Sequence, residues 1–88
     1  MNKIKILIVD DHPIMREALQ ISFTGEDDLQ VIGEASNGIE ALKLLKTLTP
    51  DIILMDLLMP KMDGLETIKH IFESNSQAKI LVLSSMED

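Results

Sequence analysis

A chain of 88 residues has room for one domain, and its 8 basic against 15 acidic side chains give a net charge of −7. This acidic balance argues against a nucleic-acid-binding surface, which requires a basic face, and the lack of cysteine excludes disulfides and thiolate metal sites. No apolar run approaches the roughly 20 residues of a membrane span, and the start Met1-Asn2-Lys3 does not have the pattern of a signal peptide. We therefore expect a small cytoplasmic domain with no membrane partner.

The first elements are predicted to be a buried strand and an amphipathic helix. The run Ile4–Val9 is apolar without alternation, which is typical of a parallel strand covered on both faces. It stops at Asp10 and Asp11. The run 11–13 (Asp-His-Pro) then resembles a helix start, with a polar cap and Pro at the first helical position. Apolar residues recur behind it at helical spacing: Met15, Ala18, Leu19 and Phe23.

The middle of the chain predicts a second strand, a second helix and a third strand. The segment Leu29–Ala35 is more mixed in polarity, so we place this strand nearer a sheet edge. After a turn at 36–38, an apolar stripe predicts a helix that Pro50 ends. The stripe consists of Ala41, Leu44, Leu45 and Leu48. The third strand, Asp51–Met55, is again apolar and leads into Asp56.

The last elements are predicted to be a third helix and a fourth strand. Asp63 and Glu66 have capping-box spacing before this helix, and its apolar residues are Leu65, Ile68, Ile71 and Phe72. The run Lys79–Leu83 predicts a strand that ends at Ser84 and Ser85. The order β-α-β-α-β-α-β is that of a doubly wound α/β fold, in which sites lie at the carboxyl ends of the strands.

Three of those strand-end residues are acidic: Asp10, Asp11 and Asp56. Carboxylates brought together repel one another unless a cation binds between them. Mg²⁺ prefers carboxylate, water and phosphate oxygens, and a carboxylate beside such a cation is a plausible nucleophile for aspartyl-phosphate chemistry. The three residues therefore indicate a Mg²⁺ site suited to phosphoryl transfer.

A simpler interpretation stays open for some of these side chains. An Asp next to a helix start caps the helix more often than it binds a metal, which applies to Asp63 and to the pair Asp10 and Asp11. Asp56 has no helix directly behind it to cap. We interpret His12 as a solvent-facing residue of the cap region, and His70 as a solvated side chain in mid-helix.

Four motifs in order resemble the receiver domain of bacterial two-component response regulators. They are the runs 6–13 (ILIVDDHP), 37–42 (NGIEAL) and 50–56 (PDIILMD), and the loop 59–66 with Met-Pro followed by Asp-Gly-Leu-Glu. The Asp-Asp-His-Pro run and the stretch 33–38 (GEASNG) are most similar to the NarL/FixJ subfamily, which has LuxR-type output domains. The resemblance implies a flavodoxin-like (CheY-like) parallel sheet with strand order 2-1-3-4.

The resemblance also implies a role for each residue of the site. Asp56 matches the phosphoacceptor, Asp11 the direct Mg²⁺ ligand, and Asp10 the neighbouring acid that acts through metal-bound water. Asp56 also takes part in the metal site, which the backbone carbonyl of Leu58 completes. Ser84 matches the residue whose hydroxyl senses the phosphoryl group, and Ser85 the small residue beside it.

The implied function is that of a phosphorylatable signal receiver. A sensor histidine kinase, or a small acyl phosphate, donates the phosphoryl group, and the modified domain switches a transcriptional output. Contact with DNA belongs to an output domain outside these 88 residues. Because the acceptor is its own substrate, the domain is not expected to be a turnover enzyme.

The chain departs from the family pattern at its C-terminal end. Receivers continue through a fourth helix, a fifth strand and a fifth helix, and the lysine that pairs with the phosphoryl oxygens follows the fifth strand. No basic residue of this chain stands in an equivalent place, and Lys61 is not a convincing substitute. We therefore expect residues 1–88 to be a receiver that is incomplete at its C-terminus. The apolar fourth-strand edge should then pair with another chain as a homodimer or strand-exchanged oligomer.

Two other functions remain open. A vestigial, non-phosphorylated interaction fragment is compatible with the missing lysine. A Mg²⁺-dependent phosphatase with an aspartate nucleophile, of the haloacid-dehalogenase type, requires a second acid two residues after the nucleophile. This chain has Leu58 at that position, which counts against it.

Overall fold

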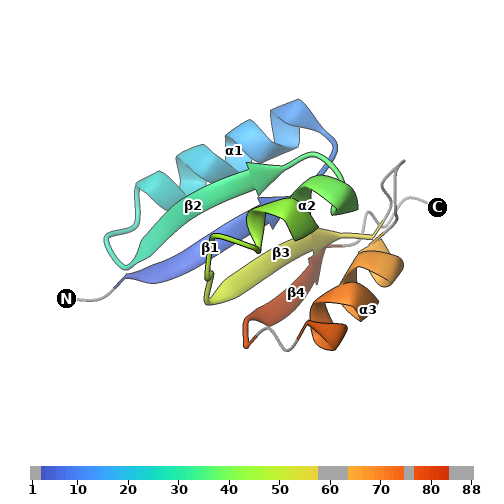
Figure 1. Cartoon of the computed structure of the whole chain (residues 1–88). Coiled ribbons are helices and arrows are strands. Elements are labelled where there is room, and N and C mark those ends of the chain that lie inside the picture. Colours follow the sequence, from blue (N-terminus) through green and yellow to red (C-terminus); the bar gives the residue numbers. More distant parts are fainter. Residues whose placement is uncertain (1–2, 58–63, 75–76, 84–88) are drawn as a thin grey trace.

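Four parallel strands form one sheet in the order β2-β1-β3-β4 in the computed structural model, which describes residues 3–57, 64–74 and 77–83. The elements follow one another as β1 (Ile4–Val9), α1 (Pro13–Thr24), β2 (Leu29–Ala35), α2 (Gly38–Leu44), β3 (Ile52–Asp56), α3 (Gly64–Glu73) and β4 (Lys79–Leu83) (Figure 1). The doubly wound α/β class and the strand order 2-1-3-4 predicted from the sequence are confirmed.

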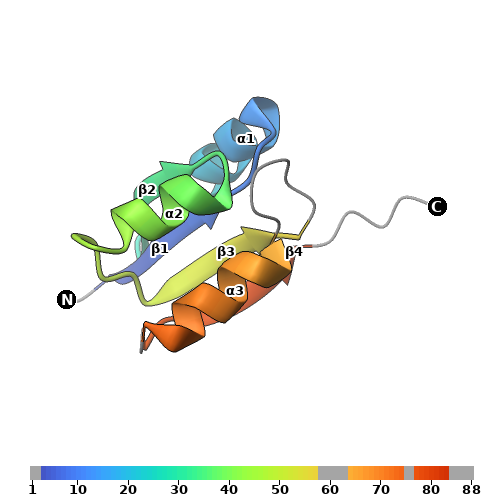
Figure 2. The ribbon, with the colours of Figure 1, turned by 45° about the vertical axis from the view of Figure 1, so that its right-hand side comes forward.

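Different helices cover the two faces of the sheet. Leu7 of β1 is buried in a cluster with Ala41 of α2 and Ile71 of α3. On the opposite face, Ile8 of the same strand packs with Leu19 of α1. Figure 2 shows α2 and α3 on one side of the strands and α1 on the other. Burial on both faces explains why β1 and β3 are apolar without alternation.

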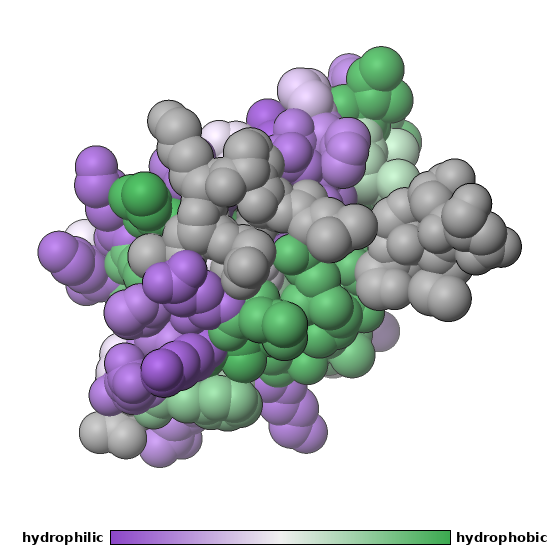
Figure 3. Space-filling view, turned by 90° about the vertical axis from the view of Figure 1, so that its right-hand side faces the viewer, coloured by the Kyte–Doolittle hydropathy of each residue, from purple (hydrophilic) through white to green (hydrophobic). Residues whose placement is uncertain are grey.

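The two edges of the described sheet differ in character. β2 lies at one edge, as its mixed polarity predicted, and β4 lies at the other. On β4, the side chains of Leu81 and Val82 are 54% and 46% exposed. Hydrophobic side chains also gather on the side of the molecule seen in Figure 3, next to polar ones. The apolar fourth-strand edge expected from the sequence is therefore present in the described residues.

Helix α2 is shorter than its apolar stripe predicted. It ends at Leu44, and a turn follows in which the N–H of Thr47 donates to the carbonyl of Leu44 at 3.0 Å. Pro50 disfavours helical backbone at the residue before it, and Thr47 also directs its hydroxyl at Leu44. Leu48 lies beyond the helix but still packs inward, since a Cβ on Gly33 of β2 would lie 2.9 Å from it.

Some of the apolar side chains that recur at helical spacing face solvent. On α3, Leu65 and Phe72 are exposed, while Thr67 and Ile71 are buried. The buried threonine shifts the core-facing side of α3 by part of a turn from the predicted stripe. Helix α1 contains no fully buried residue, and Met15 on it is exposed. Among the described helices, none is long and apolar enough to cross a membrane.

Candidate functional site

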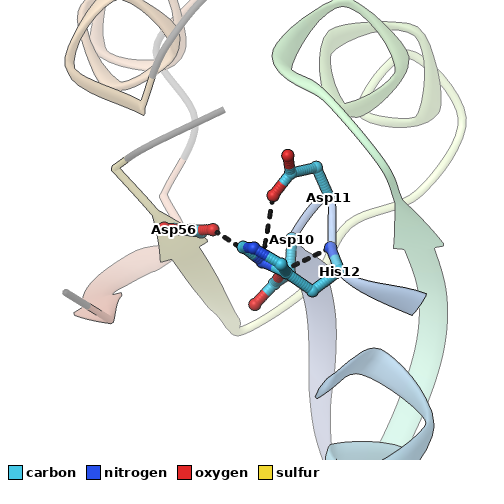
Figure 4. Close-up of side chains that lie close together, drawn as sticks. All are labelled: Asp10, Asp11, His12 and Asp56. Carbon is cyan, nitrogen blue, oxygen red and sulfur yellow. Dashed lines mark hydrogen bonds and ion pairs between the residues drawn. The ribbon is translucent and has the colours of Figure 1, made fainter. Parts of the chain in front are cut away.

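The predicted acidic residues meet at the carboxyl ends of β1 and β3. These strands are neighbours in the sheet, with Val9 opposite Met55, so the next residues, Asp10 and Asp56, come close together. Asp11 follows Asp10 in the β1–α1 turn. Ligand atoms of these three aspartates and of His12 all lie within 4.8 Å of one another (Figure 4). We call these four residues the acidic cluster.

Burial makes the repulsion within the acidic cluster costly. Asp10 and Asp56 are only 4% and 5% exposed, and the side chain of Asp11 is 25% exposed. Burying carboxylates without compensation is strongly unfavourable, and like charges at this distance oppose ionisation of their neighbours. The folded chain therefore favours a positively charged or N–H-donating group among these oxygens.

Asp10 also shapes the turn that leads into α1. Its Oδ1 accepts a hydrogen bond from the backbone N–H of His12 at 2.8 Å. Its own N–H donates to the carbonyl of Ala35 on β2, and its carbonyl accepts from Nη1 of Arg16 at 2.5 Å. Nε of Arg16 lies 3.3 Å from Oε1 of Glu34. Arg16, which the sequence analysis did not single out, thus ties α1 to the end of β1 and to β2.

The capping interpretation of Asp11 is wrong. The N-cap of α1 is His12, whose side chain makes no capping hydrogen bond, and Pro13 is at the first helical position. Asp11 lies one residue too early to accept from the first helical N–H groups. Its Oδ1 is buried and makes no hydrogen bond among the described residues, and it lies in ion-pair contact with Nδ1 of His12 at 3.0 Å. Asp63, the other capping candidate, lies outside the described residues.

His12 is a solvent-exposed residue of the cap region, as interpreted, with a side chain that is 64% exposed, but its ring also belongs to the acidic cluster. Its Nδ1 lies 2.9 Å from Oδ1 of Asp10, 3.0 Å from Oδ1 of Asp11 and 3.7 Å from Oδ2 of Asp56. The hydrogen bond to Asp10, followed by the charge of Asp11, raises the pKa of His12 above 6.5. The sequence feature that could have indicated these contacts is the position of His12 directly after Asp10 and Asp11. His70 is partly exposed on α3 and lies 3.7 Å from Glu73.

A hollow of about 530 Å³ opens beside the acidic cluster. Asp10, His12 and Asp56 line its polar side, and apolar residues of α1 together with Leu83 of β4 line the rest. A larger hollow of about 850 Å³ lies at the other end of the sheet, near Lys5 and Pro50, and contains none of the clustered carboxylates. Of these two hollows, only the smaller one reaches Asp56.

The donor set of the acidic cluster fits a hard divalent cation. Carboxylate oxygens from three residues converge, two of the residues are buried, and Oδ1 of Asp11 lacks a hydrogen bond. Mg²⁺ takes such oxygens together with water and phosphate oxygens, and has little preference for imidazole. Leu58, Ser84 and Ser85 lie outside the described residues, so the roles implied for these three residues stay predictions. Lys61 also lies outside the described residues.

Comparison with known proteins gives consistent matches over nearly the whole chain. Residues 6–88 match the response regulator receiver domain family. The chain is 46% identical to the transcriptional regulatory protein LiaR of Bacillus subtilis over 85 residues, which cover 97% of this chain and 40% of LiaR. It is 43% identical to the nitrate/nitrite response regulator protein NarL of Escherichia coli K12 over 79 residues, covering 90% of this chain and 37% of NarL.

A solved structure gives the same match in three dimensions. The signal receiver domain of the NarL response regulator of Mycobacterium tuberculosis superposes with a TM-score of 0.92 at 31% identity. The superposition covers 100% of this chain and 71% of that domain. Among the curated relatives, the chain spans about two-fifths of the length of LiaR and of the Escherichia coli NarL.

Proposed function

The chain belongs to the response regulator receiver family, and on that premise we propose that it accepts a phosphoryl group on Asp56 with Mg²⁺ bound at the acidic cluster. The observation that carries this proposal is the convergence of Asp10, Asp11 and Asp56 within 4.8 Å at the carboxyl ends of neighbouring strands. Capping does not account for Asp11 in this cluster, since the N-cap of α1 is His12.

We assign one role to each acid of the site. An oxygen of Asp56 attacks the phosphorus, a P–O bond to the aspartate forms, and the bond to the donor breaks with its electron pair leaving on the donor. Asp11 would bind Mg²⁺ directly, Asp10 would hold it through water, and Asp56 with the carbonyl of Leu58 would complete the set. When bound, the cation neutralises charge on the transferring group. Strand β3, which is buried and paired with β1 and β4, holds Asp56 in place for the attack.

The signal would then be read next to Asp56. We propose that Ser84 senses the phosphoryl oxygens through its hydroxyl and that Ser85 leaves room beside it. The added negative charge shifts an existing equilibrium between two conformations. As the acceptor is consumed and must be regenerated by hydrolysis, we describe the domain as a phosphoacceptor that takes part in its own phosphorylation and dephosphorylation, not as a turnover enzyme.

The partners follow from the family and from the relatives. We propose a sensor histidine kinase as the phosphoryl donor and, because the relatives are transcriptional regulatory proteins, a DNA-binding output domain elsewhere in the complete protein. Without cysteine, and with a transcriptional output, the domain is assigned to the cytoplasm.

Phosphorylation is tested most simply by incubating the chain with acetyl phosphate and Mg²⁺ and measuring its intact mass. The proposal predicts the addition of one phosphoryl group, lost in Asp56→Asn and retained in Asp27→Asn, which changes an exposed acid in the α1–β2 turn. Chelation of Mg²⁺ should also abolish the addition. A wild-type chain that gains no mass at saturating donor would instead support an interaction fragment without phosphoacceptor activity.

We also propose that the chain self-associates through the edge of β4, as a homodimer or a strand-exchanged oligomer. Leu81 and Val82 expose apolar surface there, and an exposed apolar edge strand favours pairing with another strand. Sedimentation equilibrium at micromolar concentration should show a dimer or larger species, and Leu81→Lys should shift it toward monomer. Ile21→Lys, at an exposed site on α1, is the matched control. A wild-type monomer would refute this proposal.

A further inference from the structure

The side chain of His12 lies where the carboxylates of the acidic cluster converge. Nδ1 is within hydrogen-bonding distance of Oδ1 of Asp10 and Oδ1 of Asp11, at 2.9 and 3.0 Å, and 3.7 Å from Oδ2 of Asp56 (Figure 4). The ring therefore contacts an oxygen of each aspartate assigned to the cation. Any other group that binds these carboxylates therefore has to use oxygen atoms that the His12 ring already contacts.

The start of α1 does not require the ring to be there. The side chain makes no capping hydrogen bond, and Pro13 fixes the first helical residue. The backbone of His12 is held separately, because its N–H donates to Asp10 and its carbonyl accepts from the N–H of Arg16 at 3.0 Å. Removing the imidazole leaves each of these backbone contacts intact.

Packing does not hold the ring in place either. The side chain is 64% exposed, so attraction to the carboxylates is what directs it inward. An exposed histidine needs only a rotation about its side-chain bonds to move into solvent. The ring can thus leave the acidic cluster without disturbing the core.

We propose that the imidazole of His12 competes with the divalent cation for the same carboxylate oxygens, so that the ring must swing outward before the cation binds. This inference rests on the proposed Mg²⁺ site. A ring N–H and Mg²⁺ cannot use the same oxygen lone pairs in the same place, and Mg²⁺ does not prefer imidazole as a ligand. His12 is accordingly a residue that sets the affinity of the site for its cation.

The competition predicts that Mg²⁺ binds more tightly when the ring is removed. In calorimetric titrations of the 88-residue chain at one fixed pH, His12→Ala should lower the Kd for Mg²⁺ roughly three- to tenfold, as expected for loss of one competing hydrogen bond. His70→Ala, which removes an imidazole beside Glu73 on α3, should leave the Kd unchanged. His12→Gln is a second variant that keeps a polar side chain, and it should also bind Mg²⁺ more tightly.

The outcomes separate this inference from the function on which it rests. If wild-type chain binds Mg²⁺ but both His12 variants bind it equally or more weakly, the competition is refuted, and weaker binding would make the imidazole a ligand. If neither wild type nor variants bind Mg²⁺ or Mn²⁺, the proposed metal site itself fails. As an independent readout, the ring resonances of His12 should shift on addition of Mg²⁺, whereas those of His70 should not.

Discussion

Helices α1 and α2 both begin at the carboxyl ends of the strands, but the polar side chains at their starts are used in opposite ways. At the start of α2, Oδ1 of Asn37 accepts from the N–H of Glu40, and Oε1 of Glu40 accepts from the N–H and hydroxyl of Ser36. At the start of α1, the N-cap side chain of His12 caps nothing, and Asp11 keeps a buried oxygen without a hydrogen bond. Polar side chains cap the helix in the first of these turns, whereas three carboxylates converge at the second, which supports the proposed cation site.

The comparison suggests how a structural carboxylate can be told from a functional one. The carboxylate of Glu40 is exposed and meets backbone and hydroxyl donors at a helix N-terminus, where negative charge is favoured. Asp10 and Asp56 are buried beside another acid, where negative charge is disfavoured. Acidic residues whose burial beside one another disfavours their negative charge therefore indicate a functional site.

The largest expected difference between the two turns is in metal binding. Asp11→Asn should raise the Kd for Mg²⁺ at least about tenfold because it removes a direct charged ligand. In metal-free buffer its free energy of unfolding should stay within about 0.5 kcal/mol of wild type or rise, since repulsion is relieved. Calorimetry and urea denaturation measure the two quantities. A marked loss of stability with unchanged metal affinity would assign Asp11 a structural role instead.

The opposite pattern is expected at the start of α2. Asn37→Ala should lower the free energy of unfolding by about 1 kcal/mol through loss of the N-cap hydrogen bond, without changing the Kd for Mg²⁺. Ser22→Ala, at an exposed position within α1, is the control and should change stability little. Reduced metal affinity in Asn37→Ala would mean that the two turns are not independent.

Arg16 connects the turn before α1 to strand β2, and its substitution should have an intermediate effect. Its guanidinium contacts the carbonyl of Asp10 through Nη1 and Oε1 of Glu34 through Nε, which the single ammonium of a lysine cannot reproduce. Arg16→Lys should raise the Kd for Mg²⁺ roughly two- to fivefold by loosening the backbone at Asp10. Lys43→Arg on α2 is the matched control. An unchanged Kd in Arg16→Lys would show that the site does not depend on this anchor.

The smallest effect is expected from acidification. Hydrogen bonds from the N–H and then the hydroxyl of Ser36 lower the pKa of Glu40 below 4.5. The contribution of the ionised Glu40 carboxylate to the free energy of unfolding is therefore present above pH 4.5, and it is lost as the pH falls through the lowered pKa. Glu40→Gln should weaken the loss of stability in this acidic range, measured by urea denaturation at several pH values. Glu17→Gln, on the exposed side of α1, should follow wild type.

The strands were the most predictable part of the molecule. Three strand ranges, Ile4–Val9, Leu29–Ala35 and Lys79–Leu83, agree with the structure. Polar residues flank each of them, and the first and last are apolar runs, while Leu29–Ala35 is more mixed. The meeting of Asp10 with Asp56 was also predictable, since parallel strands bring their carboxyl ends to one edge. Local sequence and topology alone determine these features.

Features that depend on side-chain direction were harder to predict. Helical spacing marked Leu65, Ile68, Ile71 and Phe72 as the apolar residues of α3, but it did not indicate that Thr67 would be buried while Leu65 and Phe72 are exposed. The position of the His12 ring depends on the field of three carboxylates, which exists only once the strands are assembled. The role of Arg16 likewise depends on contacts with two strands. Such contacts are tertiary and leave no periodic signal in the sequence.

The central claim is that the acidic cluster holds a divalent cation, and residue-by-residue NMR tests it most directly. On titration of the ¹⁵N-labelled chain with Mg²⁺, the account predicts saturable shifts concentrated at the amides of Asp10, Asp11, His12 and Asp56. The amides at the start of α2 and in the acidic α1–β2 turn, residues 26–28, should change little. Shifts that never saturate, or that spread equally over the acidic residues of the surface, would contradict it.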